Sequence, residues 1–374
     1  MISHMPAITR RDGLVRGECG GLVRFVDTEE HFDTALCRLL GLEQYAADRF
    51  VLRWLEISSE SGSKDAPVPL DVILSEIAAA WSSVSSRVDA SRALPGEEIT
   101  LAGQSLSADH LWASAIADAD DFMMVGTAAA PFSHAWLVHA ETGKRAGTPL
   151  YEEDYFEGEI ERVGYGSYAE QAGWRIEKGR RQTRQVQAVM RWVDLQPTRC
   201  RILDVGCGYG YFRHGVDELG WLHDGLEVSD FAAVASREMF GFDTQVGELS
   251  DVRRPSAGYD VIVMWDFIEH VADPDASLGI ARDLLRDGGL LFIRTPNLLA
   301  AERIVFGSDY HSLKLEHLHM FAPSSLAAAL VAAGLEPVVT ETEAHLLRGF
   351  LGARTAELAA MQRGSDFFVA ARRV

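Results

Sequence analysis

The chain of 374 residues is long enough for two domains, and its 47% hydrophobic content allows a large buried core. Its 55 acidic residues exceed its 35 basic ones and give a formal net charge of -20. No basic stripe is available to neutralise phosphates, so nucleic acid and anionic membranes are poor partners for this chain.

Cysteine usage and the first residues both predict a cytoplasmic protein. The four cysteines form no C-x-x-C pair, which favours reduced thiols. The opening MISHMPAITRR lacks the apolar core of a signal peptide, and no apolar run approaches the ~18 residues of a membrane span. We therefore expect neither export nor membrane insertion.

The first half of the chain is predicted to form a small α+β domain, residues 1–147. Apolar spacing predicts helices in residues 28–40 and 50–55, and one apolar seam runs through residues 70–88. The seam has two interpretations: it packs inside this domain, or it forms the face of a homodimer or a lid. No motif in this half indicates a function.

Shorter elements are expected after residue 90. EITLAGQSL is typical of a tight hairpin, and FMMVGTA and HAWLVHA of two short strands. Ser107 is expected to cap a helix that runs towards Asp120. The turn-rich and charged passage that follows predicts a domain boundary near Gly147. The histidines of this half lack metal-ligand spacing, so structural or solvent-exposed roles are expected for His31, His110, His134 and His139.

A glycine-rich turn follows the first clear strand of the second half. Residues 201–212 read RILDVGCGYGYF, with Asp204 at the strand end and glycines at Gly206, Gly208 and Gly210. Glycines of this kind let a backbone approach a ligand closely, and one such turn alone suits any nucleotide-binding βαβ unit. The spacing D-x-G-x-G-x-G differs from the dinucleotide fingerprint G-x-G-x-x-G and suits a ligand with a positive amine and no phosphate.

Further strands follow at regular intervals. Glu227 ends the strand in WLHDGLEVS at the distance where an acidic side chain meets ribose hydroxyls. In GELSD, Glu248 or Asp251 can accept a hydrogen bond from an adenine amino group. The strands YDVIVM and LLFIRTPN come next, with a helix between them. This alternation predicts a doubly wound parallel sheet.

Taken in order, these motifs resemble a class I S-adenosylmethionine-dependent methyltransferase over residues 155–374. The motifs are DVGCGYG, LEVS, GELSD, DFIEHVADP, DGGLLFIRTPN and HLHMFAPSSLAAALVAAGL. The resemblance implies an α/β, Rossmann-like seven-stranded sheet in residues 148–374, with EPVVTETE and SDFFVAARR as a final antiparallel hairpin. The sequence departs from the family by inserting HLLRGFLGARTAELAAMQRG between those two strands.

The resemblance also implies S-adenosylmethionine as cofactor and assigns residues to its parts. The residues implied to bind the methionine portion are Asp204, Gly206, Cys207, Gly208 and Gly210. Glu227 and Val228 would bind the ribose, and Glu248 and Leu249 the adenine. Asp266 would face the methionyl amine or the acceptor. Four aromatic residues resemble the cover that such enzymes place over the cofactor: Tyr155, Phe156, Tyr165 and Tyr168. The alternative for them is a core or surface role.

Methyl transfer to an alcohol or phenol needs a base beside the cofactor, because the acceptor must lose its proton. His317 is the first candidate, since the passage after the fifth strand shapes the acceptor pocket in such enzymes. His270 and Asp266 are further candidates, with a structural role as the alternative for His270. His311 and His319 are weaker ones.

A metal is a secondary alternative. Asp266, Glu269 and His270 form D-x-x-E-H, which resembles the E-x-x-E-H of quinone-pathway O-methyltransferases, where it is associated with a divalent metal. Such ligands suit Mg²⁺ or Mn²⁺. Metal-free relatives share the spacing and Asp shortens the reach, so no metal is expected.

The favoured function is O-methylation of a small molecule in secondary metabolism, with a natural-product, sugar or phenolic acceptor. This choice rests on family analogy and on a lysine-poor, alanine-rich composition typical of high-GC bacteria. N- or C-methylation is the nearest alternative, followed by a non-catalytic cofactor-binding or scaffold protein and by a nicotinamide oxidoreductase. A homodimer is a possible assembly.

Overall fold

The structure is a computed structural model that describes most of the second half of the chain and parts of the first. The described residues are 9–11, 14–16, 98–106, 112–115, 122–127, 133–142, 144–147, 151–158, 166–197, 199–306, 310–343 and 359–374. The helices predicted before residue 90, His31, His110, Tyr165 and most of the inserted segment lie outside these ranges.

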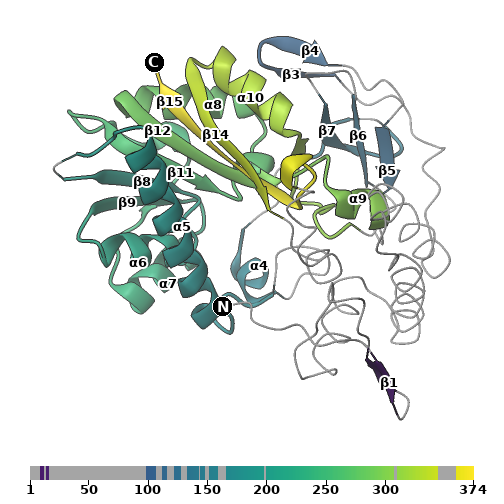
Figure 1. The fold of residues 1–374 in the computed structure, drawn as a ribbon, viewed down its shortest axis with the longest axis horizontal. Helices are drawn as coiled ribbons and strands as arrows, with labels where there is room; N and C mark the ends of the chain where they lie inside the picture. Colours follow the sequence, from purple (N-terminus) through teal and green to yellow (C-terminus); the bar gives the residue numbers. More distant parts are fainter. Residues whose placement is uncertain are drawn as a thin grey trace, which may run out of the picture.

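Seven strands form one sheet in the order β10-β9-β8-β11-β12-β15-β14 (Figure 1). The first five are parallel, and β15 is antiparallel to both of its neighbours. The predicted sheet and its antiparallel final hairpin are confirmed. The strands are β8 (Arg201–Val205), β9 (Leu222–Glu227), β10 (Gln245–Val246), β11 (Tyr259–Trp265), β12 (Leu285–Pro296), β14 (Leu335–Glu343) and β15 (Asp366–Arg373).

Helices cover both faces of this sheet (Figure 1). On one face lie α5 (Ala172–Trp192), α6 (Tyr211–Asp217) and α7 (Asp230–Phe240), and on the other lie α8 (Pro274–Leu284) and α10 (Pro323–Ala332). Shorter helices are α4 (Glu153–Glu157) and α9 (Ala301–Phe306), with 3-10 turns η2 (Leu249–Asp251) and η3 (Ile268–His270).

Side-chain caps set where two of these helices begin. The Ser229 hydroxyl accepts a hydrogen bond from the backbone N–H of Ala232, and the Asp273 carboxylate accepts one from Ala276. These oxygens satisfy N–H groups that the first helical turn leaves unpaired, and Pro274 fits the first position because it has no N–H to lose. Ser229 lies just beyond the carboxyl end of β9, whereas Asp273 follows β11 only after the η3 turn, so the two caps fix how the chain enters α7 and α8.

The first half of the chain contributes further strands. The predicted hairpin is present as β3 (Ile99–Leu101) and β4 (Gln104–Leu106), and the two predicted strands as β6 (Phe122–Thr127) and β7 (His134–His139). The helix predicted from Ser107 towards Asp120 is wrong, because β5 (Trp112–Ala115) is a strand there and pairs with β6. A local cap signal is outweighed by pairing with a neighbouring strand. A two-stranded ribbon joins β1 (Thr9–Arg11) and β2 (Leu14–Arg16).

The two halves of the chain share one sheet. The short strand β13 (His319–Phe321) pairs antiparallel with β7 and completes a four-stranded sheet in the order β13-β7-β6-β5. At the β3–β4 turn, the N–H groups of Ala102 and Gly103 donate to the carboxylate of Asp275 at the start of α8, at 2.9 and 3.1 Å. The boundary predicted near Gly147 therefore passes between strands of a common sheet, and the division into two domains stays a prediction.

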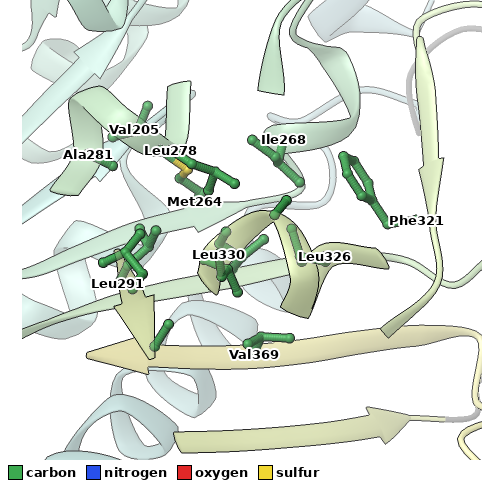
Figure 2. Close-up of a cluster of buried hydrophobic side chains, with 14 of the residues drawn as sticks. Val205, Met264, Ile268, Leu278, Ala281, Leu291, Phe321, Leu326, Leu330 and Val369 are labelled. Carbon is green, nitrogen blue, oxygen red and sulfur yellow. The ribbon is translucent and has the colours of Figure 1, made fainter. Parts of the chain in front are cut away.

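One hydrophobic core runs from the large sheet into these added strands. Figure 2 shows side chains of β11, β12 and β15 facing α8 and α10, with Phe321 of β13 beside them. Trp136 of β7 belongs to the same core and is fully buried. None of the described helices combines the length and the apolar character needed to cross a membrane.

Candidate functional site

A cavity of about 1890 Å³ lies at the carboxyl ends of the parallel strands. Its wall includes the glycine turn after β8, the end of β9, the η2 and η3 turns and one side of α5. Ligand pockets commonly measure ~300–1,000 Å³, so this cavity has room for two ligands together. The carboxyl edge of an open parallel sheet is the usual place for such a site.

The glycine turn needs residues without side chains. Gly206 and Gly208 have φ angles of +69° and +50°, which side chains rarely tolerate. A Cβ atom on Gly206 would lie 2.9 Å from the Phe267 ring. The turn is tied to the next strand, because the N–H groups of Gly206 and Cys207 both donate to the carbonyl of Leu226. Gly206, Cys207 and Gly208 thus place open backbone on the cavity wall, whereas Gly210, also predicted to hold the cofactor, faces Ser236 and Phe242 and does not line the cavity.

Glu227 is fixed by the backbone around it. Its carboxylate accepts hydrogen bonds from the N–H groups of Gly208 (2.8 Å), Val228 (2.9 Å) and Ser229 (3.1 Å). The side chain lines the cavity although it is largely buried. Burial raises the pKa of Glu227, and the three N–H groups oppose that rise by stabilising the charged form. The strand end therefore presents an oriented acceptor group to the cavity.

Asp204 lies beside Glu227 on the cavity wall. Burial raises the pKa of Asp204 to about 8; the positive charge of Arg213 opposes the rise and the negative charge of Glu227 adds to it. A carboxyl with this pKa is mostly protonated at neutral pH. A cationic group bound beside it would favour the ionised form.

The η2 turn and an aromatic cluster line other parts of the cavity. Glu248 is exposed and Leu249 is buried, and both lie on the wall. On another side, a Cβ on Gly208 would meet the rings of Tyr168 at 3.8 Å and Phe156 at 4.0 Å. Tyr155 packs edge-on against Phe156 and also lines the cavity. Three of the four predicted cover aromatics therefore lie beside the glycine turn.

Asp266 is held by two cations. Its carboxylate accepts from Lys178 of α5 at 3.0 Å and from Arg294 of β12 at 2.7 and 2.8 Å, and Arg294 also pairs with Asp366. Burial alone would raise the pKa of Asp266, but Arg294 and Lys178 outweigh it and the pKa is lowered. The backbone φ of +54° at Asp266 is a strained conformation held by these contacts. Asp266 lines the cavity as a fixed anion, which is a poor arrangement for a base.

Of the predicted histidine bases, His270 lines the cavity and His317 does not. The Nδ1 atom of His270 lies 2.9 Å from the carbonyl oxygen of Glu316, so this nitrogen must carry the hydrogen and donate it. The Nε2 atom of neutral His270 is then an acceptor. Burial lowers the pKa of His270 to about 4, which keeps the ring neutral at physiological pH.

His317 packs behind His270, with ring centroids 4.9 Å apart and its own Nδ1 bound to the carbonyl of Ser312 at 2.8 Å. His311 lines the cavity, whereas His319 pairs with His134 across the shared sheet, with Nδ1 and Nε2 3.1 Å apart.

The three residues of the metal alternative, Asp266, Glu269 and His270, do not form one cluster in the structure. Asp266 is engaged by Lys178 and Arg294, whereas Glu269, His270 and His317 each place a potential ligand atom within 4.8 Å of the others. One oxygen of Glu269 accepts from the Thr295 hydroxyl at 2.9 Å. These three groups are close enough to share one cation, which is a different set from the one that the D-x-x-E-H spacing indicates.

Sequence reasoning missed the basic residues of the site. Lys178 and Arg175 stand on one face of α5, and Arg294 follows the apolar core of β12. The guanidinium of Arg175 lies 3.4 Å from the centre of the Tyr168 ring. The available signal was a helix just after the aromatic segment whose basic residues recur at intervals of three.

Comparison with known proteins points to one family. A family model described as a methyltransferase domain matches residues 177–341. Among curated proteins, a ubiquinone biosynthesis O-methyltransferase of Xanthomonas axonopodis pv. citri is 30% identical over 155 residues, 38% of this chain and 65% of that protein. One from Paraburkholderia phymatum is 28% identical over 162 residues, 39% of this chain and 69% of that protein. The alignments thus span about two thirds of these relatives.

Solved structures are also similar. An S-adenosylmethionine-dependent methyltransferase from Mesorhizobium loti has 19% identity and a TM-score of 0.38, covering 50% of this chain and 96% of that one. A methyltransferase from Archaeoglobus fulgidus has 19% identity and a TM-score of 0.38, covering 50% of this chain and 93% of that one. The family predicted from the sequence motifs is confirmed by the family model, and residues 177–341 of this chain belong to the methyltransferase-domain family.

Proposed function

We propose that this chain transfers the methyl group of S-adenosylmethionine to a hydroxyl oxygen of a small molecule, with His270 accepting the hydroxyl proton. The observation that carries the proposal is a cavity wall on which the glycine turn, the oriented Glu227 carboxylate and the acceptor nitrogen of His270 all lie. The curated relatives are named as O-methyltransferases, which supports oxygen as the methylated atom.

The residues present fit the cofactor. Gly206 and Gly208 leave backbone open to the methionine part, and Glu227 offers carboxylate oxygens to a ribose diol. Leu249 and Glu248 supply an apolar surface and a polar group for the adenine. When bound, S-adenosylmethionine supplies an electrophilic methyl group on a sulfonium.

The protein's own part in the reaction is alignment and proton removal. A neutral His270 needs no prior deprotonation, because its Nε2 carries a free lone pair. With S-adenosylmethionine bound, the acceptor oxygen would gain the methyl group as the carbon–sulfur bond breaks, and Nε2 of His270 would take the hydroxyl proton. The imidazole would then carry the positive charge that the cofactor brings, so the net charge of the site would not change.

His270 is favoured over the other two predicted bases on geometry. His317 is absent from the cavity wall, and both oxygens of Asp266 already accept hydrogen bonds from Lys178 and Arg294. N- or C-methylation remains the nearest alternative within the same site, since it would use the same cofactor residues.

The decisive experiment measures methyl transfer to a panel of catechols, phenols and sugars, for the purified protein and for His270→Gln. Gln keeps a polar side chain but cannot take a proton, so we expect kcat to fall by about 100-fold or more while cofactor affinity stays within a few-fold. A matched His214→Gln variant, at a histidine that does not line the cavity, serves as control. Full turnover by His270→Gln would refute the base assignment.

The same assay tests the metal alternative. Activity that survives EDTA and a metal-free protein by elemental analysis would exclude a required cation at Glu269, His270 and His317. Loss of activity on chelation, restored by Mg²⁺ or Mn²⁺, would instead reassign His270 from base to ligand.

A further inference from the structure

We propose that Arg181, Gln182 and Gln185, here called the α5 donor face, bind an anionic oxygen group of the acceptor, a carboxylate or a phosphate. This inference rests on the proposed function and names the class of acceptor. The three side chains line the same cavity as the glycine turn. They lie at the C-terminal end of the part of α5 that borders this cavity.

One face of α5 is turned to the cavity along most of the helix. The lining residues of α5 are Trp174, Arg175, Lys178, Arg181, Gln182 and Gln185. Their spacing of one, three, three, one and three residues is that of a single helix face, and at 1.5 Å per residue it extends for about 16 Å. The cavity wall is therefore a long helical stripe, much longer than one carboxylate needs.

The donors at the far end of this stripe have no acceptor within the described part of the protein. Gln182 is more than nine-tenths buried, yet its side-chain amide makes no hydrogen bond to any described residue. Gln185 is half-buried and, among the described residues, equally unpaired; Arg181 is exposed and forms no ion pair with any of them. The amide of Gln182 is not among the fully enclosed polar atoms of the described residues, so it is open to the cavity, where water or a ligand can bind it.

Neighbouring cations of the same helix are paired. Arg180 binds the carboxylate of Glu218, Arg184 binds Glu177, and Lys178 binds Asp266. Arg181 and Arg175 thus both face the cavity without a carboxylate partner in the described residues, but Arg175 lies over the Tyr168 ring, whereas Arg181 has no such contact there. In a chain with a net charge of -20, such an arginine marks a place where a negative group can bind.

The cofactor occupies the other end of the stripe in this proposal. Arg175 lies over Tyr168, which borders Gly208 of the glycine turn, so Arg175 is at the cofactor end. Arg181 stands six residues further along α5, about 9 Å away along the helix axis. The α5 donor face is therefore left to the second ligand.

Aromatic rings complete this end of the cavity. Trp265 stacks on Phe368 with centroids 6.0 Å apart, and Phe212 meets the Trp265 ring edge-on at 5.6 Å. All three line the cavity and belong to the cluster against which α5 packs. Flat rings pack well on such a surface. The arrangement fits a ring compound that carries a carboxylate or phosphate.

The test measures binding to the full-length protein saturated with S-adenosylhomocysteine, which fills the cofactor part of the cavity. The probes are benzoate, phenyl phosphate and the neutral benzyl alcohol, titrated by calorimetry or by NMR. We expect at least one anion to bind about tenfold more tightly than benzyl alcohol, and the stronger anion distinguishes carboxylate from phosphate. Arg181→Gln should abolish this preference, whereas Arg184→Gln on the outer side of α5 should keep it.

Two results would overturn the inference. One is equal binding of both anions and benzyl alcohol to the saturated protein, and the other is an anion preference that persists in Arg181→Gln. A protein that fails to bind S-adenosylhomocysteine at all would count against the proposed function instead, so the two failures are distinguishable.

Discussion

Glu227 shows how one side chain can be oriented by the chain itself before any ligand arrives. Three backbone N–H groups hold its carboxylate at the carboxyl end of β9, and two of them come from the residues that directly follow it. Charge-assisted hydrogen bonds of this kind are stronger than neutral ones. The carboxylate therefore needs little reorganisation when it accepts hydroxyl groups from a ribose.

Glu227→Gln should weaken S-adenosylmethionine binding by about tenfold or more. The amide offers one acceptor oxygen instead of two, and its NH₂ group faces backbone N–H donors. Titration calorimetry measures the change. Glu238→Gln, at an exposed residue of α7 that does not line the cavity, is the control, with an expected change below about threefold. Unaltered affinity in Glu227→Gln would remove the ribose assignment.

Asp204 should make stability depend on pH. Its pKa is raised from 3.8 to about 8 by burial, so the folded state binds the proton more tightly than the unfolded chain does. The stability from this group is complete below about pH 4 and is lost as the pH rises towards 8, by at most about 1.4 kcal/mol for each pH unit.

Denaturant unfolding between pH 5 and pH 9 tests this effect in the cofactor-free protein. Asp204→Asn removes the titrating group and should give a flatter profile than the unaltered protein over this range. Asp287→Asn, whose side chain is 96% exposed, should leave the slope unchanged. Parallel profiles for all three proteins would contradict the raised pKa.

Sequence spacing located the residues that end strands, but not the contacts that decide their chemistry. Asp204 and Glu227 lie at the ends of β8 and β9, Asp266 follows β11, and all three line the cavity. What the spacing could not show is that Asp266 is paired with Lys178, 88 residues away in sequence. Long basic side chains reach across elements, so their targets depend on the assembled fold.

At the scale of elements, an ion pair between Lys178 of α5 and Asp266, just after β11, joins the helix to the edge of the sheet. Lys178→Met keeps the alkyl chain and removes the charge. We expect the pKa of Asp266 to rise towards its ordinary value, because one of the two cations that lower it is lost. Since a depressed carboxyl pKa contributes stability above its unfolded value and loses it in acid, the variant should unfold at a higher pH on acidification.

The expected loss of stability at neutral pH is about 1–2 kcal/mol, since both side chains are partly exposed to solvent. Acid titration followed by circular dichroism gives the unfolding midpoint, and carbon NMR of the Asp266 carboxyl gives its pKa. Arg184→Met, which removes a pair with Glu177 on the outer side of α5, should shift neither. An unchanged Asp266 titration in Lys178→Met would show that Arg294 alone sets its charge.

The prediction of elements succeeded where hydrophobic patterns were long and failed where pairing was distant. Strands β8, β11 and β12 have apolar runs that identify them without context, whereas β9 reads LHDGLE and has no such run. The strand β13 has three residues, and its partner β7 lies about 185 residues earlier. No local pattern encodes such a pairing, and the same holds for β5, where a cap signal at Ser107 pointed to a helix.

At the scale of the whole molecule, the shared sheet and core imply that residues 98–146 and the methyltransferase domain unfold together. Trp136 of β7 is fully buried, and it belongs with Phe321 of β13 to the core that packs under α8 and α10. A side chain buried there contributes to the stability of both parts, although it lies on the N-terminal side of the boundary predicted near Gly147.

Trp136→Ala should therefore lower the free energy of unfolding by about 3–5 kcal/mol, because it removes a large buried ring and leaves a cavity. If the two parts are one cooperative unit, the variant unfolds in a single thermal transition, and S-adenosylhomocysteine raises the melting temperature of that transition.

Calorimetric scans of both proteins, with and without the ligand, measure the number of transitions and their melting temperatures. Trp192→Ala, at a ring that is 79% exposed, is the control and should leave the melting temperature nearly unchanged. The variant could instead show two transitions, one at a lowered temperature and one at the temperature of the unaltered protein. If S-adenosylhomocysteine then raised only the second, the boundary near Gly147 would separate independent domains.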